Sequence, residues 1–299
     1  MAERAGGADA AIAASERPFV GMALMALGAG LLTLMDGIGK LLLRDLPLIE
    51  VTWARYAFNL LALWLLVRLR QRTIVASRRL SLQIARGLAM VLATGSMFLS
   101  LSLLPMAETY AVGFASPLIV ALLAGPLLGE RVDSWRWAAA LGGFFGVLVV
   151  LRPGSEMFSL AALAPLVMAL CFALYQLATR VLGRFDPALT TMFHSAWIGT
   201  AVLLPLLPAV WQIPDGRQIL LMALMGVLGL SSHLAMIRAF ALAPASLVSP
   251  MIYTQMAWAV AFGWLVFGDW PDLWTLVGAG LVAASGLLLL RSSSPSENR

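Results

Sequence analysis

The sequence predicts an all-α integral membrane protein with ten transmembrane helices in two inverted five-helix repeats. Three observations support this prediction: the composition, the number of apolar runs, and motifs that recur at a fixed offset. Apolar residues make up 61% of the 299 residues and charged residues only 12%. The mean hydropathy of +0.90 is far above that of a soluble domain.

The ten apolar runs are bounded by charged residues, proline or glycine. We expect spans at residues 18–43, 48–67, 80–103, 107–128, 135–151, 158–179, 188–210, 218–237, 246–267 and 273–290. Most are close to the roughly 20 residues that a helix needs to cross a bilayer. Residues 1–17 are rich in alanine, glycine and charge, so we expect a disordered cytoplasmic tail there and a second tail at 292–299.

Arginine is distributed unequally between the two sides of these spans. Fourteen arginines lie in or beside the tails and the connections on the side of both termini, and three (Arg44, Arg152 and Arg217) lie on the other side. Cytoplasmic connections carry the excess of basic residues in membrane proteins. We therefore expect both termini in the cytoplasm and a multi-pass protein of the plasma membrane, which is the inner membrane in a bacterium.

An internal repeat divides the chain into two units, which we place at residues 18–152 and 153–291. The motif Gly129-Glu130-x-x-Asp133-x-Trp135 recurs as Gly268-Asp269-x-x-Asp272-x-Trp274, Lys40 and Pro47 recur as Arg180 and Pro187, and Pro105 recurs as Pro244. Each unit has five spans, so the second enters the membrane in the opposite orientation. Inverted repeats of this kind are typical of secondary transporters.

These motifs also resemble a known family. The segment 105–154, with Pro117, Gly129-Glu130 and Leu151-Arg152-Pro153-Gly154, resembles the first EamA-type unit of the drug/metabolite transporter superfamily. The segment 238–269 is similar to the second unit, with Asp269 where the family often has glutamate. The resemblance implies a ten-helix transporter with cytoplasmic termini. It also implies transport of small metabolites, often outward, through a cavity shared by the two halves.

Four ionisable residues of the first two spans lie at matching depths around the turn at residues 44–47. Asp36 lies eight residues before this turn and Arg55 eight after it, about 12 Å below the turn, while Lys40 and Glu50 lie nearer to it. We expect a charge ladder of Asp36 with Arg55 and Lys40 with Glu50, acting as an outer gate. The alternative is that these pairs only neutralise charge and fix the hairpin.

The second repeat has a weaker polar set at the equivalent positions. The counterparts of the four ladder residues are Gln176, Arg180, Thr190 and Ser195, with His194 beside the last. Because the second repeat is inverted, this set is expected toward the cytoplasm, where Gln176, Arg180 and His194 would form a softer inner gate.

Polar and aromatic residues near the middle of the spans form a candidate substrate site. A proline inside a helix frees a backbone carbonyl, and Pro117 and Pro250 lie within two predicted spans. The residues that we expect to contact substrate are Trp53, Thr94, Ser96, Tyr110, Ser116, Ser231, Ser232, His233, Tyr253 and Gln255. The alternatives are core packing for each aromatic residue and simple kinking for each proline.

Other residues indicate what the protein does not do. His194 and His233 do not have a metal-ligand spacing, and one cysteine, Cys171, excludes a cysteine-based metal site, so we expect no metal and no cofactor. Arg86 either extends to the lipid headgroups or contacts an anionic substrate group. The basic residues are dispersed in short connections, which argues against nucleic acid as a partner. A proton-coupling role for either histidine or for Asp36 is a further alternative.

The fifth and tenth spans lack interior charge and carry small residues. Gly142-x3-Gly146 and Gly280-x3-Ala284 are faces that let helices approach closely. We expect these spans to pack within a monomer or to join two monomers in a weak homodimer.

The sequence therefore predicts a secondary transporter that works by alternating access, with a small-molecule substrate and the lipid bilayer as its partners. The aromatic and neutral mid-span residues favour export of amino acids, including aromatic ones. Uptake of a larger nucleoside- or cofactor-like metabolite is the alternative, and a passive channel or structural membrane protein is the alternative class. No Gly-x-Ser-x-Gly or His-Glu-x-x-His motif indicates an enzyme, and no Walker motif indicates direct ATP drive.

Overall fold

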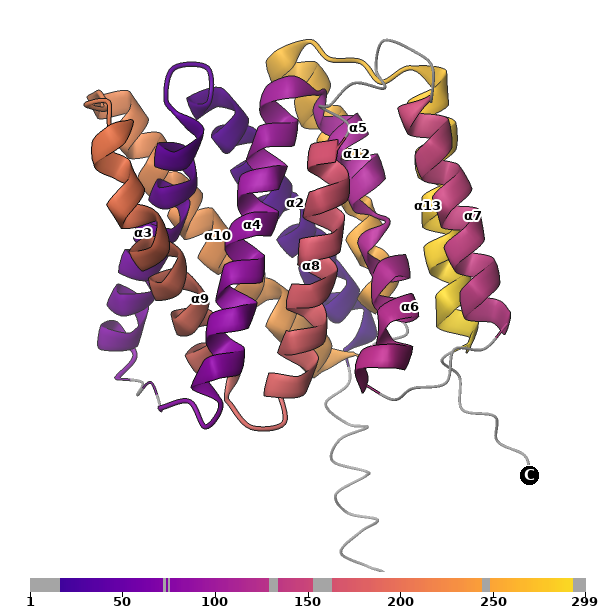
Figure 1. Ribbon diagram of the computed structural model, residues 1–299, viewed down its shortest axis with the longest axis horizontal. Helices are drawn as coiled ribbons and strands as arrows, with labels where there is room; N and C mark the ends of the chain where they lie inside the picture. Colours follow the sequence, from indigo (N-terminus) through magenta and orange to yellow (C-terminus); the bar gives the residue numbers. More distant parts are fainter. Residues whose placement is uncertain are drawn as a thin grey trace, which may run out of the picture.

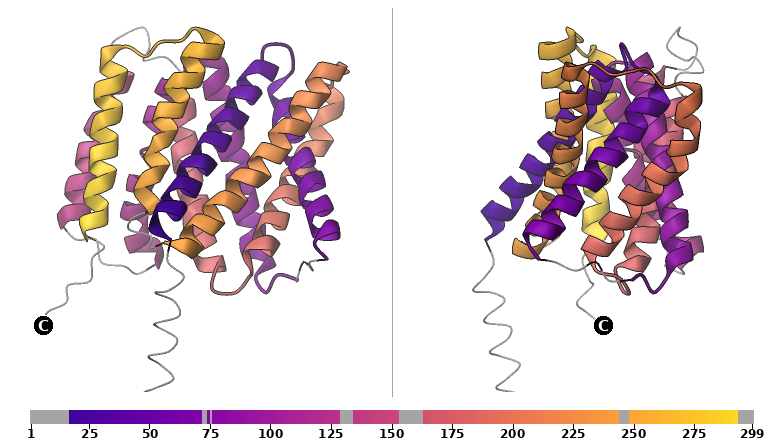
Figure 2. Two further views of the ribbon diagram at one scale, coloured as in Figure 1. Left: turned by 180° about the vertical axis from the view of Figure 1, so that it is seen from behind. Right: turned by 90° about the vertical axis from the view of Figure 1, so that its left-hand side faces the viewer.

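The computed structural model describes residues 17–71, 74, 76–128, 134–152, 163–243 and 248–292. These residues form a bundle of ten helical spans whose axes are roughly aligned, and no strand occurs among them (Figure 1). The described ends of the chain, at the start of the first span and the end of the tenth, lie at the same end of the bundle (Figure 2). The protein is thus the all-α membrane protein that the sequence predicts.

The ten spans agree with the predicted ranges to within a few residues, except that residues 158–162 and 246–247 lie outside the described part. The first half contains α2 (Pro18–Leu42), α3 (Leu48–Leu69), α4 (Leu80–Leu103), α5 (Met106–Gly113), α6 (Ser116–Leu128) and α7 (Ser134–Leu151). The second contains α8 (Leu163–Leu182), α9 (Ala188–Leu203), η2 (Leu204–Ala209), α10 (Gly216–Leu242), η3 (Ser249–Tyr253), α12 (Thr254–Phe262), η4 (Gly263–Phe267) and α13 (Leu273–Ser292). Among these, five spans are long and apolar enough by length and composition alone to cross a membrane: 18–42, 80–103, 163–182, 188–209 and 216–240.

Two spans are interrupted, as their prolines predict. The fourth breaks between α5 and α6, where Phe114 and Ala115 form a turn directly before Ser116 and Pro117. Pro117 has no N–H to donate to the carbonyl of Gly113, so the regular α-helical ladder stops there. The ninth span begins as a 3₁₀ turn that contains Pro250 and ends as a π-helical turn. Irregular backbone at this depth is tolerated only inside the protein or beside a cavity.

The helix contacts have the symmetry expected of a duplicated chain. The span pair α2 with α10 has α8 with α4 as its counterpart, and α3 with α10 has α9 with α4. The pairs α3 with α9, α5 with α12 and α7 with α13 each join equivalent spans. Exchange of the two halves therefore leaves this set of contacts unchanged, as an inverted repeat requires. In Figure 1 the α7 and α13 pair stands at one edge of the bundle.

The centre of the bundle is apolar, and so is much of its outer surface. Met35, Phe98, Leu101, Met106 and Met225 are fully buried where the two halves meet. Large apolar side chains are exposed along the outside of most spans. Because lipid chains contact these surfaces, the charges of the bundle are confined to its interior and its two ends.

The contact between α7 and α13 corrects one part of a sequence prediction, the packing of the Gly280-x3-Ala284 face within the monomer. Gly146 lies against the backbone of Gly278, so close that a Cβ on Gly278 would lie 2.6 Å from the Gly146 carbonyl oxygen. Gly280 has no neighbour within 4 Å, and Ala284 is exposed. The side of α13 that packs on α7 is therefore the Gly278 side, and the predicted Gly280-x3-Ala284 face points away from α7. The rotation of α13 about its own axis could not be predicted from the sequence positions of its small residues.

We predict that Gly278→Ala destabilises the protein, by about 1–3 kcal/mol, because the new methyl group overlaps backbone that cannot move aside. The matched control is Gly280→Ala, which should leave stability equal or slightly higher because alanine favours helix over glycine. Thermal unfolding in detergent, followed by tryptophan fluorescence, compares the midpoints of the two variants. An unchanged midpoint for Gly278→Ala would contradict the close approach of α7 and α13.

The end of the bundle that carries the termini is joined by a cluster of hydrogen bonds around Asp186. This residue precedes α9, and its carboxylate accepts hydrogen bonds from the Ser77 hydroxyl, from the Arg78 N–H at 3.0 Å and from the Gln83 amide at 2.8 Å. Burial raises the pKa of Asp186, but these hydrogen bonds outweigh it and lower the pKa below its ordinary value. The turn between α8 and α9 is thereby fixed to α4 of the other half.

We predict that Asp186→Asn lowers the thermal midpoint by an amount that depends on pH. A carboxyl with a depressed folded pKa stabilises the fold above its unfolded pKa, and this contribution is lost as the pH falls through the folded value. The difference between wild type and variant should therefore be constant above about pH 5 and shrink below about pH 4. Asp45→Asn, in an exposed turn at the opposite end, is the control and should change little at any pH. A difference that grows toward low pH would contradict this assignment.

Candidate functional site

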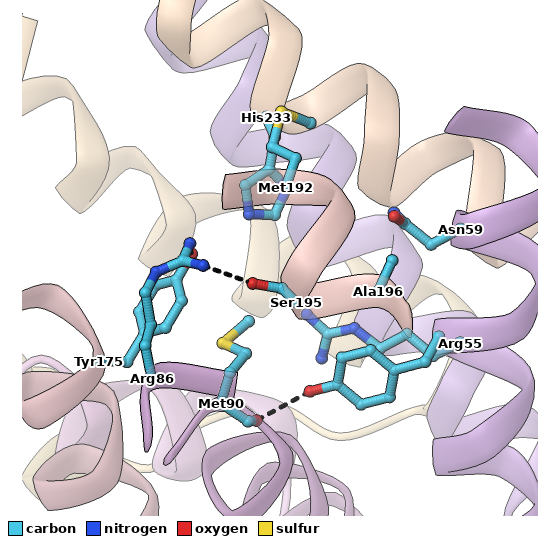
Figure 3. Close-up of a pocket in the computed structure, with 10 residues that line it drawn as sticks. Arg55, Asn59, Arg86, Met90, Tyr175, Met192, Ser195, Ala196 and His233 are labelled. Carbon is cyan, nitrogen blue, oxygen red and sulfur yellow. Dashed lines mark hydrogen bonds between the residues drawn. The ribbon is translucent and has the colours of Figure 1, made fainter. Parts of the chain in front are cut away.

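A pocket of about 450 Å³, including space open to solvent, lies inside the bundle between five helices. It is lined by Arg55, Tyr56 and Asn59 of α3, Arg86 and Met90 of α4, Tyr175 of α8, Met192, Ser195 and Ala196 of α9, and His233 of α10. Both halves of the chain therefore contribute to it. Figure 3 shows Arg86 with Tyr175 on one side of this pocket and Arg55 with Asn59 on the opposite side.

The pocket lies between the middle of the bundle and the end that carries the termini. Arg86 is six residues from the start of α4, Tyr175 seven from the end of α8, and Ser195 seven from the start of α9. At 1.5 Å per residue these three positions are about 9–11 Å from that end. Three helices that are remote in sequence thus place polar side chains at one depth.

The Arg86 guanidinium is almost fully engaged by neutral oxygens. Its Nε donates to the Thr179 hydroxyl at 2.6 Å, its Nη1 to the Thr191 carbonyl at 3.0 Å and the Ser195 hydroxyl at 2.7 Å, and its Nη2 to the Tyr175 hydroxyl at 2.8 Å. The same guanidinium lies over the Tyr175 ring at 4.4 Å. Arg86 is 3% exposed, so it does not extend to the lipid headgroups. It links α4 to α8 and α9 and keeps its charge beside the pocket.

The Arg55 guanidinium is much less engaged. Its one hydrogen bond runs from Nη1 to the Thr94 hydroxyl at 3.2 Å, and the group lies 5.8 Å from the centre of the Phe98 ring. A guanidinium has five N–H donors, so most of those on Arg55 face no protein acceptor. Thr94 is itself held by the Tyr56 hydroxyl at 2.8 Å. This arrangement orients Arg55 while leaving donors for a ligand.

The charges around the pocket favour an anionic group. Among the described residues, no carboxylate lies within ion-pair distance of Arg55 or Arg86. Two guanidiniums therefore face a cavity in a medium of low dielectric with only neutral partners in contact. A carboxylate in this pocket would be attracted by both charges and could form a bidentate contact with Arg55.

His233 adds an acceptor to the same pocket. Its Nδ1 lies 2.7 Å from the Gly229 carbonyl oxygen. A carbonyl only accepts hydrogen bonds, so Nδ1 carries a proton, and Nε2 of the neutral ring is left as an acceptor. The pocket therefore offers donors from the two arginines and Asn59 and an acceptor from His233.

The predicted pairing of Asp36 with Arg55 is wrong. Asp36 is 4% exposed, and its Oδ2 accepts a hydrogen bond from the Tyr110 hydroxyl at 2.6 Å, while Oδ1 has no hydrogen-bond partner. Arg55 attracts this carboxylate electrostatically but does not contact it. The two residues do lie at equal depth, but each bonds to a neutral group instead of to the other. Asp36 bonds to Tyr110 of α5, and Arg55 bonds to Thr94 of α4.

The predicted pairing of Lys40 with Glu50 is also wrong. Lys40 Nζ forms an ion pair with Asp269 Oδ2 at 3.0 Å and donates to the Leu104 carbonyl at 3.0 Å. Glu50 is fully buried, and its Oε2 accepts from the backbone N–H of Gln212 at 3.0 Å. Each charge thus joins its helix to the other half of the chain instead of closing the hairpin of α2 and α3.

The Lys40 and Asp269 pair belongs to a charged cluster at the end of the bundle opposite the termini. Arg152 forms an ion pair with Asp272 there. Glu108, at the start of α5, is 8% exposed and interacts electrostatically with all four of these residues. Glu108 was not among the predicted residues, although a carboxylate three residues after Pro105, at the start of a span, was a signal for it.

The predicted inner-gate residues lie near the opposite end. His194 is buried between Phe193 and Trp197, with Nδ1 2.8 Å from the Thr190 carbonyl. Gln176 is half-buried and Arg180 is exposed on the last turn of α8. None of the three lines the pocket, although Ser195, one residue from His194, does.

Of the ten predicted substrate residues, His233 lines the pocket and the other nine do not. Thr94 supports Arg55, and Tyr110 bonds Asp36. Trp53 packs edge-to-face against Trp211 with ring centres 6.0 Å apart, and Tyr253 packs in the same way against Phe114 at 5.3 Å. Ser116, Ser232 and Gln255 are buried, and Ser96 and Ser231 are half-buried, outside the lining.

Several residues of the pocket were not predicted from the sequence. Tyr56 and Asn59 follow Arg55 on the same helix, and for Asn59 the spacing of four residues from an intramembrane charge was the available signal. Tyr175 is next to Gln176, one of the positions that the repeat relates to the charged set. No pattern in the sequence indicated Met90, Met192 or Ala196.

Two inverted five-helix repeats around a shared polar pocket are typical of membrane transporters. The sequence profile of the EamA-like transporter family matches residues 19–152 and 159–291. The chain therefore belongs to the EamA-like transporter family, as the resemblance implied.

Curated relatives of this chain are transporters of several small molecules. It is 26% identical to an S-adenosylmethionine uptake transporter of Rickettsia conorii, over 88% of this chain and 90% of that protein. It is 32% identical to a riboflavin transporter of Vibrio cholerae, over 60% of this chain and 61% of that protein. It is 26% identical to a pseudopaline exporter of Pseudomonas aeruginosa, over 91% of this chain and 96% of that protein. A crystal structure of a protein 18% identical to it shares the fold, with a TM-score of 0.61 over 90% of this chain and 99% of that one.

We predict a measurable coupling energy between Lys40 and Asp269, because the pair is partly shielded from water, with side-chain exposures of 14% and 32%. A double-mutant cycle with Lys40→Met and Asp269→Asn should give about 0.5–1 kcal/mol from thermal midpoints in detergent. A second cycle that replaces Asp269→Asn by Asp45→Asn is the control and should give no coupling. Additive effects in the first cycle would show that the ion pair does not stabilise the fold.

Proposed function

We propose that the protein is a secondary transporter for small metabolites that carry a carboxylate beside an aromatic or apolar group. The observation that carries this proposal is the Arg55 guanidinium, which lines the pocket with most of its N–H donors unused. Arg86 adds a second positive charge. A buried guanidinium without a carboxylate partner is costly in a membrane unless a substrate supplies that partner.

Two substrate candidates share the required carboxylate. A cofactor-like molecule such as S-adenosylmethionine has an amino-acid end and an aromatic base, and similarity to the Rickettsia conorii uptake transporter favours this candidate and its uptake. Aromatic amino acids, moved outward, are the second candidate. They are favoured by the donor and acceptor pattern of Arg55 and His233, which fits a carboxylate and an ammonium group, and by the aromatic lining from Tyr56 and Tyr175.

The proposed cycle alternates access through rearrangement of the two halves. At the end opposite the termini, the ion pair of Lys40 with Asp269 joins α2 to the end of the ninth span. At the other end, Asp186 joins the second half to Ser77 and Gln83 of the first. Release of the first link would open the pocket outward, and release of the second would open it inward. The membrane is the plasma membrane in this proposal, the termini are cytoplasmic, and the unit is a monomer or a weak homodimer.

The test is transport by the purified protein in liposomes, with radiolabelled S-adenosylmethionine and phenylalanine as probes. We expect saturable flux of at least one probe, inhibited by its unlabelled form. Decarboxylated S-adenosylmethionine and phenethylamine, which lack the carboxylate, should not inhibit. Equal inhibition by the decarboxylated compounds would contradict the role of the carboxylate, and the absence of flux with both probes would contradict the substrate class.

Arg55→Met should lower kcat/KM for that probe by about 10- to 100-fold, because a hydrogen bond to a charged group contributes about 1.5–3 kcal/mol. Arg68→Met is the matched control, since Arg68 is an exposed arginine of the same helix that lies over Trp64 and away from the pocket. Its flux should equal that of the wild type. Equal loss in both variants would assign the effect to the fold of α3 and not to the pocket.

A further inference from the structure

Asp36 is a buried acid that the proposed transport cycle has not used. It lies six residues from the end of α2 that is opposite the termini, and Arg55 lies seven residues from the same end of α3, so the two are at nearly the same depth. The pocket extends from Arg55 toward the end that carries the termini, and Asp36 does not line it. Its side chain is 4% exposed, one carboxyl oxygen is bonded by Tyr110, and the other has no partner. An ionised carboxyl with one oxygen that accepts no hydrogen bond is costly at this depth and needs a nearby positive charge.

Arg55 is the charge that stabilises ionised Asp36. Two groups of neighbouring helices interact with the Asp36 carboxyl: Arg55 of α3 electrostatically and Tyr110 of α5 through a hydrogen bond. The other charged or titratable groups near it on α2, α3, η3 and α10 have different partners: Lys40 with Asp269, Glu50 with Gln212, Tyr253 with Phe114, and His233 with Gly229. Helix α12 carries no titratable group, and Arg86 of α4 is held by α8 and α9.

Arg55 can therefore stabilise either of two anions, the Asp36 carboxylate and the carboxylate of a substrate. It contacts neither within the protein alone, because its hydrogen bond goes to Thr94. When a substrate carboxylate binds Arg55 through the pocket, the positive charge is neutralised and ionised Asp36 loses its support. The carboxyl then becomes more stable with a proton.

We propose that substrate binding at Arg55 is coupled to proton uptake by Asp36, so that an anionic group and a proton are carried together. This inference rests on the proposed function, because it requires a carboxylate at Arg55. The proton comes from water and adds to one Asp36 oxygen, with Tyr110 still bonded to the other. The proton offsets the charge of the bound carboxylate beside Arg55, while the ammonium group of an amino-acid substrate keeps its own charge.

Coupling of this kind is reciprocal. If substrate favours protonation of Asp36, then protonation of Asp36 favours substrate by the same factor. Apparent affinity should rise by up to about tenfold for each unit fall in pH over the range in which one proton is taken up per substrate. An inward proton gradient then drives uptake. The same site can exchange substrate for substrate without a gradient.

The first experiment measures proton uptake on binding, using purified protein in weakly buffered detergent with a pH-indicator dye. Phenylalanine and S-adenosylmethionine are the probes, and binding is measured in parallel by equilibrium dialysis. We expect wild type to take up as much as one proton per bound molecule near neutral pH and Asp36→Asn to bind without proton uptake. Glu50→Gln, which removes another buried acid but keeps an acceptor for Gln212, is the control and should behave as wild type.

Each outcome decides the proposal. Binding without proton uptake in wild type overturns the coupling and leaves the transport proposal standing. Binding of neither probe removes the substrate class and the coupling together. Proton uptake that persists in Asp36→Asn overturns the assignment to Asp36.

A second experiment keeps the test valid if Asp36→Asn folds poorly. In liposomes, Asp36→Glu retains a carboxyl and should keep acceleration of uptake by an inward proton gradient. Asp36→Asn should still exchange labelled for unlabelled probe but lose the acceleration by the gradient. Acceleration in Asp36→Asn equal to wild type would overturn the proposal.

Discussion

The interior of a bilayer offers no water to an ion, and the structure depends on how two buried cations and one partly buried cation meet this constraint. Lys40 is neutralised by a carboxylate, Asp269. Arg86 is solvated by four neutral oxygens of the second half. Arg55 is supported by one threonine hydroxyl and, at longer range, by Asp36. The three differ in how completely they are satisfied, and the least satisfied cation lies beside the pocket. The degree of satisfaction therefore separates structural charges from the charge available to a ligand.

The same contacts join the two repeats. Lys40 reaches from α2 to the ninth span, Arg86 from α4 to α8 and α9, and Asp186 from the turn before α9 to Gln83 of α4. Polar links at both ends and in the middle thus cross between the halves, while the fully buried apolar residues fill the space around them. Any rearrangement of one half against the other has to break polar links at one end, and those links are few enough for that to occur.

The edge of the bundle has a different construction. The α7 and α13 pair meets through glycine backbones, with Gly146 against Gly278. The described interior of this pair has no buried charged residue. Close backbone packing gives a stiff contact. We interpret this pair as a fixed support beside the eight spans that carry the polar links.

The sequence by itself determined the fold class, the ten spans and the duplication, because hydropathy, span length and an odd number of spans per repeat are properties of the chain. It also placed Asp36 and Arg55 at one depth, since depth follows from counting residues. It did not determine which helices are neighbours or how each is rotated about its axis. Only the tertiary structure paired Lys40 with Asp269, 229 residues away, and brought Arg86 and Arg55 to one pocket. Partner choice depends on rotation and packing of all ten helices together, and no local pattern contains that information.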